Sequence, residues 1–331
     1  MNGVFIIPTG IGCKIGGHAG DATPAAKLVA SVCDNLIIHP NVVNASDINE
    51  MTDNMLYVEG SQLDAFLYGH HNLKKVQSNK ILVVVNRSVD NSVINSVSAA
   101  RATLGADIEI MELARPLVMV GDIEADGTAG GSFSGHGELL SQLISYKFDA
   151  LAIISKIEIN KQTALNYANY GGVNPWGGIE AKVSNFIAKN LGVPVAHAPF
   201  GHTLSDYNNI VNPCMAAEFV SVSYMHCVLK GLYKAPRLVR SGGDLAVGDI
   251  DFLVSPFGCY GPPHVACVNA GIPIIYVKEN TTILNKIVDH PLCITVENYL
   301  EAMGVISALK IGISIESVRR PLAYTKVRMW E

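Results

Sequence analysis

Several side chains able to transfer protons or attack a substrate stand directly after short apolar runs. Cys259 lies between glycines in "FGCYGPPH", with His264 five residues further on, a setting that favours a thiolate or an acid/base pair. His39 and His197 each end an apolar run, and a histidine can exchange protons near neutral pH. Glu279 follows another run in "VKENTT", where a carboxylate can act as a base. We predict Cys259, His197, His39 and Glu279 as catalytic residues; a buried structural role is the alternative for the cysteine and for each histidine.

The loop after the first apolar run is rich in glycine. It reads "IIPTGIGCKIGGHAGD", and Gly10, Gly12 and Gly16 form a G-x-G-x-x-x-G pattern. This pattern resembles the phosphate-binding turn of dinucleotide folds, where glycines let backbone N–H groups approach a pyrophosphate. The helix starts beyond the glycines, however, and the next run ends in His39-Pro40 instead of the acidic residue that holds a ribose.

We predict that this loop surrounds a small phosphate or carboxylate with backbone amides; a structural turn and a nicotinamide-binding turn are the alternatives. The predicted ligand-binding residues in the loop and at neighbouring strand ends are Gly10, Gly12, Lys14, Gly16, Gly17, His18, Asp21, Asn41, Asn280 and Thr281. His18, Asp21, His39 and His136 are metal-ligand types, but no H-x-x-x-H or H-E-x-x-H spacing supports a metal site, and none is predicted.

The elements that must position these residues are visible as apolar runs without alternation. Such runs indicate strands buried on both faces, as in parallel sheets covered by helices. They occupy residues 4–7, 35–39, 81–86, 107–113, 151–155, 193–198, 251–256, 272–277 and 293–296. Helical patterns lie between them, for example at 24–32, 178–192 and 298–312, the last with Asn298 as N-cap and Gly312 at its end.

This alternation predicts an α/β fold with doubly wound, mostly parallel, Rossmann-like sheets. We expect two lobes with a cleft between them: residues 1–120 with the glycine-rich loop, and residues 121–331 with the Cys259 loop and the C-terminal helix. Ligands of such sheets bind at the carboxyl ends of the strands, where the candidate residues stand.

Composition restricts the partners. A net charge of −5 gives no general attraction to nucleic acid or to anionic membranes. Charged residues make up 16% of the chain, against about 25% in ordinary domains, which favours a homo-oligomer. No apolar run is long enough to span a membrane, no basic segment precedes "VFIIP", and the seven cysteines form no C-x-x-C pair, so we expect a cytoplasmic protein.

Several segments resemble a known family. They are "IIPTGIGCKIGGHAGDATPAAKLVA", "LIIHPNVVNAS", "MLYVEG", "ARATLGA", "GVNPWGGIEA", "VPVAHAP", "IIYVKENTT" and "NYLEAMGVISALKIGI", and they are similar to the bacterial and plant family labelled domain of unknown function 3326. The family has an Ala-Cys-Gly-Gly element where this chain reads Gly258-Cys259-Tyr260-Gly261. The cysteine matches, and the residues directly before and after it differ. The resemblance implies a single-family protein without an accepted reaction, and it transfers no catalytic residue.

The residues therefore predict a metabolic enzyme that binds a small anion and uses acid/base or cysteine-assisted isomerase, lyase or transferase chemistry. An NAD(P)-dependent oxidoreductase is one alternative, so the cofactor stays open. A non-catalytic ligand-binding or assembly subunit is the other.

Overall fold

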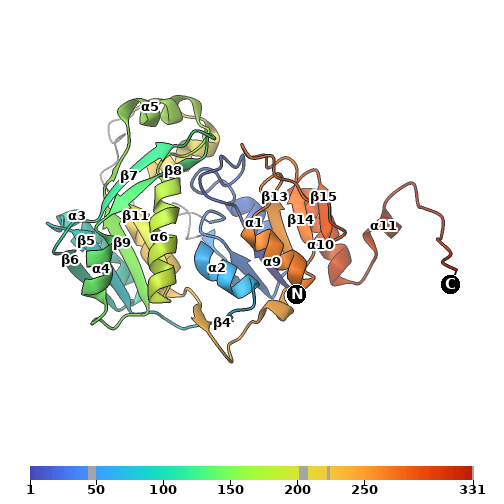
Figure 1. Cartoon of the computed structure of the whole chain (residues 1–331), viewed down its shortest axis with the longest axis horizontal. Coiled ribbons are helices and arrows are strands. Elements are labelled where there is room, and N and C mark those ends of the chain that lie inside the picture. Colours follow the sequence, from blue (N-terminus) through green and yellow to red (C-terminus); the bar gives the residue numbers. More distant parts are fainter. Residues whose placement is uncertain (44–49, 201–207, 222–223, 330–331) are drawn as a thin grey trace.

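The computed structural model describes residues 1–43, 50–200, 208–221 and 224–329. Two sheets in which every strand pairs in parallel stand side by side, and helices cover both (Figure 1). This confirms the predicted α/β class with mostly parallel, doubly wound sheets.

The larger sheet has six strands in the order β15-β14-β13-β1-β2-β3. Their bounds are β1 (Asn2–Phe5), β2 (Asn35–Ile38), β3 (Met55–Tyr57), β13 (Phe252–Pro256), β14 (Ile274–Val277) and β15 (Cys293–Val296). In β1, Val4 and Phe5 are both fully buried because they point to opposite faces and each face is covered. Helices α1 (Thr23–Ala30) and α10 (Tyr299–Lys310) pack on the Phe5 face, and α2 (Gly60–Leu67) and α9 (Pro262–Ala270) pack on the Val4 face.

The smaller parallel sheet has four strands in the order β11-β9-β5-β6. They are β5 (Ile81–Asn86), β6 (Ile108–Leu113), β9 (Ala150–Ser155) and β11 (Val195–Pro199). Helices α3 (Asn91–Leu104) and α8 (Tyr224–Tyr233) cover one face, and α4 (His136–Leu143), α5 (Lys161–Tyr170) and α6 (Gly177–Leu191) belong to the core of the other.

The six-stranded sheet with its helices and the four-stranded sheet with its helices are called the two lobes below, and shorter elements complete them. Strands β7 (Val118–Ile123), β8 (Ala129–Ser134) and β10 (Ile157–Glu158) form a small sheet beside α6, and β4 (Asn72–Lys74) pairs with β12 (Arg237–Val239). Further short helical segments are η2 (Pro213–Met215), α7 (Ala216–Val220), η3 (Val247–Asp249) and α11 (Ile315–Val318). In the described part of the chain, no helix combines the length and the apolar character needed to cross a membrane.

The sheets combine distant parts of the chain. Strands from residues 2–57 and 252–296 share the six-stranded sheet, while residues 81–199 supply the four-stranded one. The glycine-rich loop and the Cys259 loop consequently follow neighbouring strands, β1 and β13. The predicted division of the chain at residue 120 stays a prediction.

Side-chain caps explain where helices α10 and α2 begin. The side chain of Asn298 accepts a hydrogen bond from the Glu301 N–H (2.9 Å), as the sequence predicts for α10. Helix α2 is capped by Glu59, whose carboxylate accepts from the N–H groups of Ser61 (2.9 Å) and Gln62 (3.2 Å). A buried carboxylate is thereby fixed at the end of β3, close to the strand ends described next.

Candidate functional site

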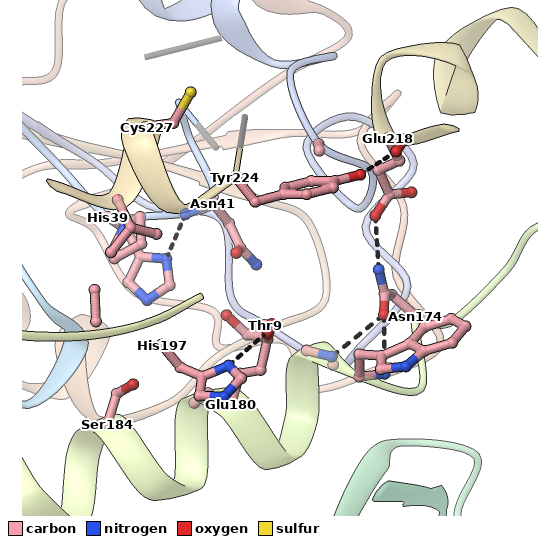
Figure 2. A pocket seen from close by; sticks show the side chains of 18 of the residues that line it. Thr9, His39, Asn41, Asn174, Glu180, Ser184, His197, Glu218, Tyr224 and Cys227 are labelled. Atoms are coloured by element: carbon pink, nitrogen blue, oxygen red, sulfur yellow. Dashed lines mark hydrogen bonds and ion pairs between the residues drawn. The ribbon is translucent and has the colours of Figure 1, made fainter. Parts of the chain in front are cut away.

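A pocket of about 550 Å³ lies between the two lobes, at strand ends of both sheets (Figure 2). It is called the interlobe pocket below. Its walls come from the segments that follow β1, β2 and β3 on one side, and from α6, β11, α7 and α8 on the other. The lining residues used below are Thr9, Gly10, Gly12, Cys13, Gly17, His39, Asn41, Glu59, Tyr167, Asn174, Gly177, Glu180, His197, Glu218 and Tyr224.

A chain of hydrogen bonds leads from the pocket wall into the four-stranded lobe. Glu180 Oε1 lies 3.0 Å from His197 Nδ1, and His197 Nε2 lies 3.0 Å from Ser155 Oγ. Helix α6 positions Glu180, while the adjacent strands β11 and β9 position His197 and Ser155. The side chain of Glu180 is 25% exposed and that of His197 is 0% exposed, so the carboxylate is the accessible member of the pair.

This order of residues favours Glu180 as the proton-transfer group. Ser155 is buried behind the histidine, against Met119 Sδ (3.0 Å), so it does not offer a nucleophile to the pocket. His197 Nδ1 contacts Glu180 and Nε2 contacts Ser155 Oγ, so both ring nitrogens have hydrogen-bond partners and the ring is held in place. Glu180 Oε2 has no hydrogen-bond partner among the described residues and is available to a substrate.

A second carboxylate, Glu218, is held by a separate cluster (Figure 2). The Tyr167 hydroxyl donates to Glu218 Oε2 (2.6 Å), and Asn174 Nδ2 donates to Glu218 Oε1 (2.7 Å). The Tyr224 hydroxyl donates to the backbone oxygen of Glu218. Burial, followed by the charge of Glu218, raises the pKa of Tyr167, which therefore stays protonated.

The cluster also fixes the start of α6. Asn174 Oδ1 accepts from the N–H groups of Trp176 (2.9 Å) and Gly177 (3.2 Å), so the residue that binds Glu218 also orders the first turn of the helix that carries Glu180. Burial, followed by the charges of Glu218 and Glu180, raises the pKa of Tyr224. Both carboxylates thus act on one lining hydroxyl.

The glycine-rich loop contributes backbone to the pocket. Among the described residues, no acceptor is found for the N–H groups of Thr9, Gly10 and Gly12, all of which line it. A Cβ on Gly17 would lie 2.1 Å from the Cys13 carbonyl oxygen, so the loop can fold back on itself only with glycine at that position.

Six of the predicted residues line the interlobe pocket: Gly10, Gly12, Gly17, His39, Asn41 and His197. Burial lowers the pKa of His39 to about 4, so the ring is neutral at physiological pH. Its Nδ1 accepts a hydrogen bond from the Asn41 N–H (3.3 Å). The ring also has a hydrogen bond with the Ile7 backbone, so His39 is a neutral ring held by its own lobe, and its protonation is strongly disfavoured.

Eight predicted residues do not line the interlobe pocket: Cys259, Glu279, Lys14, Gly16, His18, Asp21, Asn280 and Thr281. His18 Nδ1 lies behind it, 2.8 Å from the Tyr167 hydroxyl and 3.5 Å from Glu218 Oε2. Asp21 accepts from the Gly16 N–H (2.6 Å), which orders the loop. Burial raises the pKa of Asp21 to about 6.

Asn280 and Thr281 hold the glycine-rich loop from outside. Asn280 is fully buried; its Oδ1 accepts from the Ile15 N–H (2.9 Å), and its Nδ2 donates to the Ile15 carbonyl (2.9 Å) and the Tyr299 hydroxyl (2.7 Å). The Thr281 carbonyl accepts from the Lys14 N–H (2.9 Å). These contacts give both residues a structural role.

Cys259 and Glu279 stand apart from the interlobe pocket. Cys259 is buried with its sulfur 3.2 Å from Ser255 Oγ, and His264 Nε2 lies 2.7 Å from the same hydroxyl. Burial raises the pKa of Cys259 to about 11 and lowers that of His264 to about 4, so both are neutral at physiological pH. Glu279 is exposed and accepts from the Tyr299 N–H (3.1 Å) beside the start of α10.

The sequence reasoning missed Glu180, Glu218 and Tyr167. Glu180 follows the "WGG" turn that starts α6. A carboxylate in the first turn of a helix that begins with two glycines was therefore the signal in the sequence that could have identified it. Glu218 and Tyr167 carry no such signal, because their helices are separated by almost fifty residues and meet only in the folded protein.

The pocket wall is acidic. Its described residues include the carboxylates Glu59, Glu180 and Glu218 and the two histidines, without a lysine or arginine. Within the described ranges, no three His, Cys, Asp or Glu side chains are grouped as a metal site. Among the described lining residues, backbone N–H groups are therefore the groups able to contact an anionic part of a ligand without like-charge repulsion.

The chain belongs to the family described as "Protein of unknown function (DUF3326)", which matches residues 2–319. It is 33% identical over 330 residues to a protein of Synechococcus named "Uncharacterized lipoprotein syc1174_c", a match that covers 95% of this chain and 92% of the relative. No solved structure matches the chain. The family resemblance read from the sequence is confirmed, and it brings no reaction with it.

Proposed function

We propose that this protein is a small-molecule enzyme whose substrate binds in the interlobe pocket and reacts by proton transfer without a redox cofactor, as in an isomerase, lyase or transferase. The observation that carries the proposal is the hydrogen-bonded chain Glu180–His197–Ser155. A carboxylate at a pocket wall, with its other oxygen free and a buried histidine fixing its orientation, is a suitable general base.

The cluster around Glu218 supplies the proton donor that a base such as Glu180 requires as its counterpart. Glu218 and the protonated Tyr167 belong to elements other than α6, and both line the pocket. A base that removes a proton and a separate donor that returns one together allow isomerisation, or elimination of a leaving hydroxyl or amine. The Tyr167 hydroxyl is the proposed donor: Glu218 accepts its hydrogen bond in the free protein, and the proton would pass to the substrate as negative charge develops there.

The substrate is a small anion that also carries hydroxyl or ammonium groups. The free N–H groups of Thr9, Gly10 and Gly12 support binding of its carboxylate or phosphate. The acidic wall supports binding of hydrogen-bond donors elsewhere on the same molecule. Hydroxy acids, amino acids and phosphorylated sugars combine these features.

The test is exchange of substrate hydrogen with solvent. Wild-type protein is incubated in D₂O with hydroxy acids, amino acids and phosphorylated sugars, and proton NMR follows the loss of C–H signals. The variant Glu180→Gln keeps the size of the side chain, and we expect it to lower the exchange rate by about 10²–10⁴-fold while ligand-induced thermal shifts persist. Glu158→Gln, at an exposed position outside the pocket, is the matched control and should exchange like wild type.

Each result has a defined meaning. Equal exchange by wild type and Glu180→Gln would contradict the role of this carboxylate. A thermal shift without exchange would favour a non-catalytic ligand-binding subunit, and a shift with NAD(P) would favour the oxidoreductase alternative.

We also propose a cytoplasmic homo-oligomer. All seven cysteines are free thiols, which supports a reducing compartment. The relative from Synechococcus is named a lipoprotein, so cell fractionation is the decisive measurement: recovery of this protein in the membrane fraction would refute the cytoplasmic location.

A further inference from the structure

A second cavity, of about 360 Å³, lies between α2 and the C-terminal part of α6. It shares no described lining residue with the interlobe pocket. Gln62 and Ala65 of α2 form one wall, Ala188 and Lys189 of α6 form another, and Arg240 follows β12. The cavity thus contacts both lobes.

Gln62 is one of two residues of this cavity that packing does not explain; the other is His71, whose Nδ1 also has no hydrogen-bond partner among the described residues. The residue is only 2% exposed, and neither Oε1 nor Nε2 of its side chain has a hydrogen-bond partner among the described residues. A buried amide without partners is destabilising, so such groups are normally paired with protein, water or ligand. The amide offers an acceptor and a donor together, and it matches a partner group that has both.

Two cationic side chains stand beside this amide. Lys189 and Arg240 line the cavity, and neither forms an ion pair within the described part of the chain. Asp64, two residues after Gln62 in α2, is half-buried; burial raises its pKa to about 6, and Lys189 partly opposes that shift. Lys189 also acts on the buried Glu59, where its charge opposes the rise in pKa that burial causes. Two carboxylates are therefore within reach of Lys189, and Arg240 is the cation without an ion-pair partner among the described residues.

We propose that this cavity is a second binding site, distinct from the interlobe pocket, for a small dicarboxylate that carries a hydroxyl or amino group. Lys189 and Arg240 each pair with one carboxylate. Gln62 Oε1 accepts from the ligand's hydroxyl or amino group, and Nε2 donates to an oxygen of the ligand. The volume falls in the range of small-molecule pockets, at its lower end, which suits a compact ligand.

Calorimetric titration with L-malate, L-aspartate and succinate at fixed ionic strength tests the site. Succinate has both carboxylates but lacks the hydroxyl or amino group. We expect wild type to bind malate and aspartate at least about tenfold more tightly than succinate, because only they satisfy the Gln62 acceptor. In Gln62→Leu this preference should disappear, whereas Arg240→Gln should weaken all three ligands.

Two control variants distinguish binding in this cavity from binding elsewhere on the protein. Gln77→Leu, at an exposed position away from both cavities, should keep the wild-type preference. Glu180→Gln, in the interlobe pocket, should also keep it; loss of malate binding in this variant instead of Gln62→Leu would place the ligand in the interlobe pocket and overturn the proposal.

Stability without ligand gives an independent check. Gln62→Leu removes an unpartnered amide and keeps a similar volume, so its thermal midpoint should equal or exceed that of wild type. A clearly lower midpoint would mean that the amide already has a partner and would overturn the proposal. Equal affinity of wild type for malate and succinate, or no heat with any of the three, would show that the cavity holds water only and would overturn it as well.

Discussion

Replacing Asp21 by asparagine should change how the stability of the protein depends on pH. Asp21 lies in the glycine-rich loop, and its Oδ1 accepts the Gly16 N–H. Burial raises its pKa from 3.8 to about 6, so the folded protein favours the protonated carboxyl group. The asparagine oxygen keeps the acceptor but cannot ionise.

The size and sign of the effect follow from linkage. The folded state binds the proton more tightly than the unfolded state, so the contribution of Asp21 to the free energy of unfolding is most favourable below pH 3.8 and decreases as the pH rises to about 6. At about 1.4 kcal/mol for each tenfold change in acidity constant, the upper limit is about 3 kcal/mol. Because the side chain is only partly buried, solvent screening reduces this value to about 1–2 kcal/mol.

Urea unfolding of wild type and Asp21→Asn across this pH range measures the effect. We expect the stability of the variant relative to wild type to increase by about 1–2 kcal/mol between acidic and neutral pH. Asp90→Asn is a control of opposite sign, because hydrogen bonds from Ser92 lower the pKa of the exposed Asp90 and stabilise its charged form. Parallel curves for wild type and Asp21→Asn would refute the assigned burial of this carboxylate.

Three further outcomes can be measured directly. Gly178→Ala would place a Cβ 2.2 Å from the Ala129 carbonyl oxygen and should lower the free energy of unfolding by about 1–3 kcal/mol. Gly304→Ala, where a Cβ meets nothing within 4 Å, should raise it by about 0.5–1 kcal/mol, and equal urea midpoints for the two variants would contradict this contrast. Asn280→Ala should cost at least about 2 kcal/mol because it removes three buried hydrogen bonds, and a neutral effect in the same assay would argue against its structural role. Cys214 is the exposed member of the seven cysteines and should react fastest with a thiol reagent, so a rapid phase that survives Cys214→Ala would show that another thiol is accessible.

Local sequence patterns determined much of the secondary structure and the strand ends at which the candidate residues lie. The run "ILVVVN" lacks alternation because β5 is covered on both faces, and this property of the residues themselves identified a parallel strand. Gly10, His39 and His197 were found because polar or small residues at the ends of buried strands are conspicuous in the sequence.

Pocket residues outside those strand ends are harder to recognise in the sequence. Glu180 lies inside a helix, and the meeting of Glu218 with Tyr167 depends on how two separate helices pack. Cys259 follows a strand end and matched the same sequence rule, but the fold buries it beside Ser255 and away from the interlobe pocket. The rule identifies a position along the strand and leaves the direction of the side chain undetermined.

The sequence by itself determined the α/β class, the parallel pairing and the family. Only the tertiary structure decided that residues 252–296 complete the sheet begun by residues 2–57, and that the strand ends of two sheets face one pocket. The physical reason is that hydrophobic pattern and capping report burial and hydrogen bonding over a few neighbouring residues. Which buried surfaces meet depends on contacts between residues far apart in the chain, and those contacts set the distances on which the chemistry of Glu180 and His197 depends.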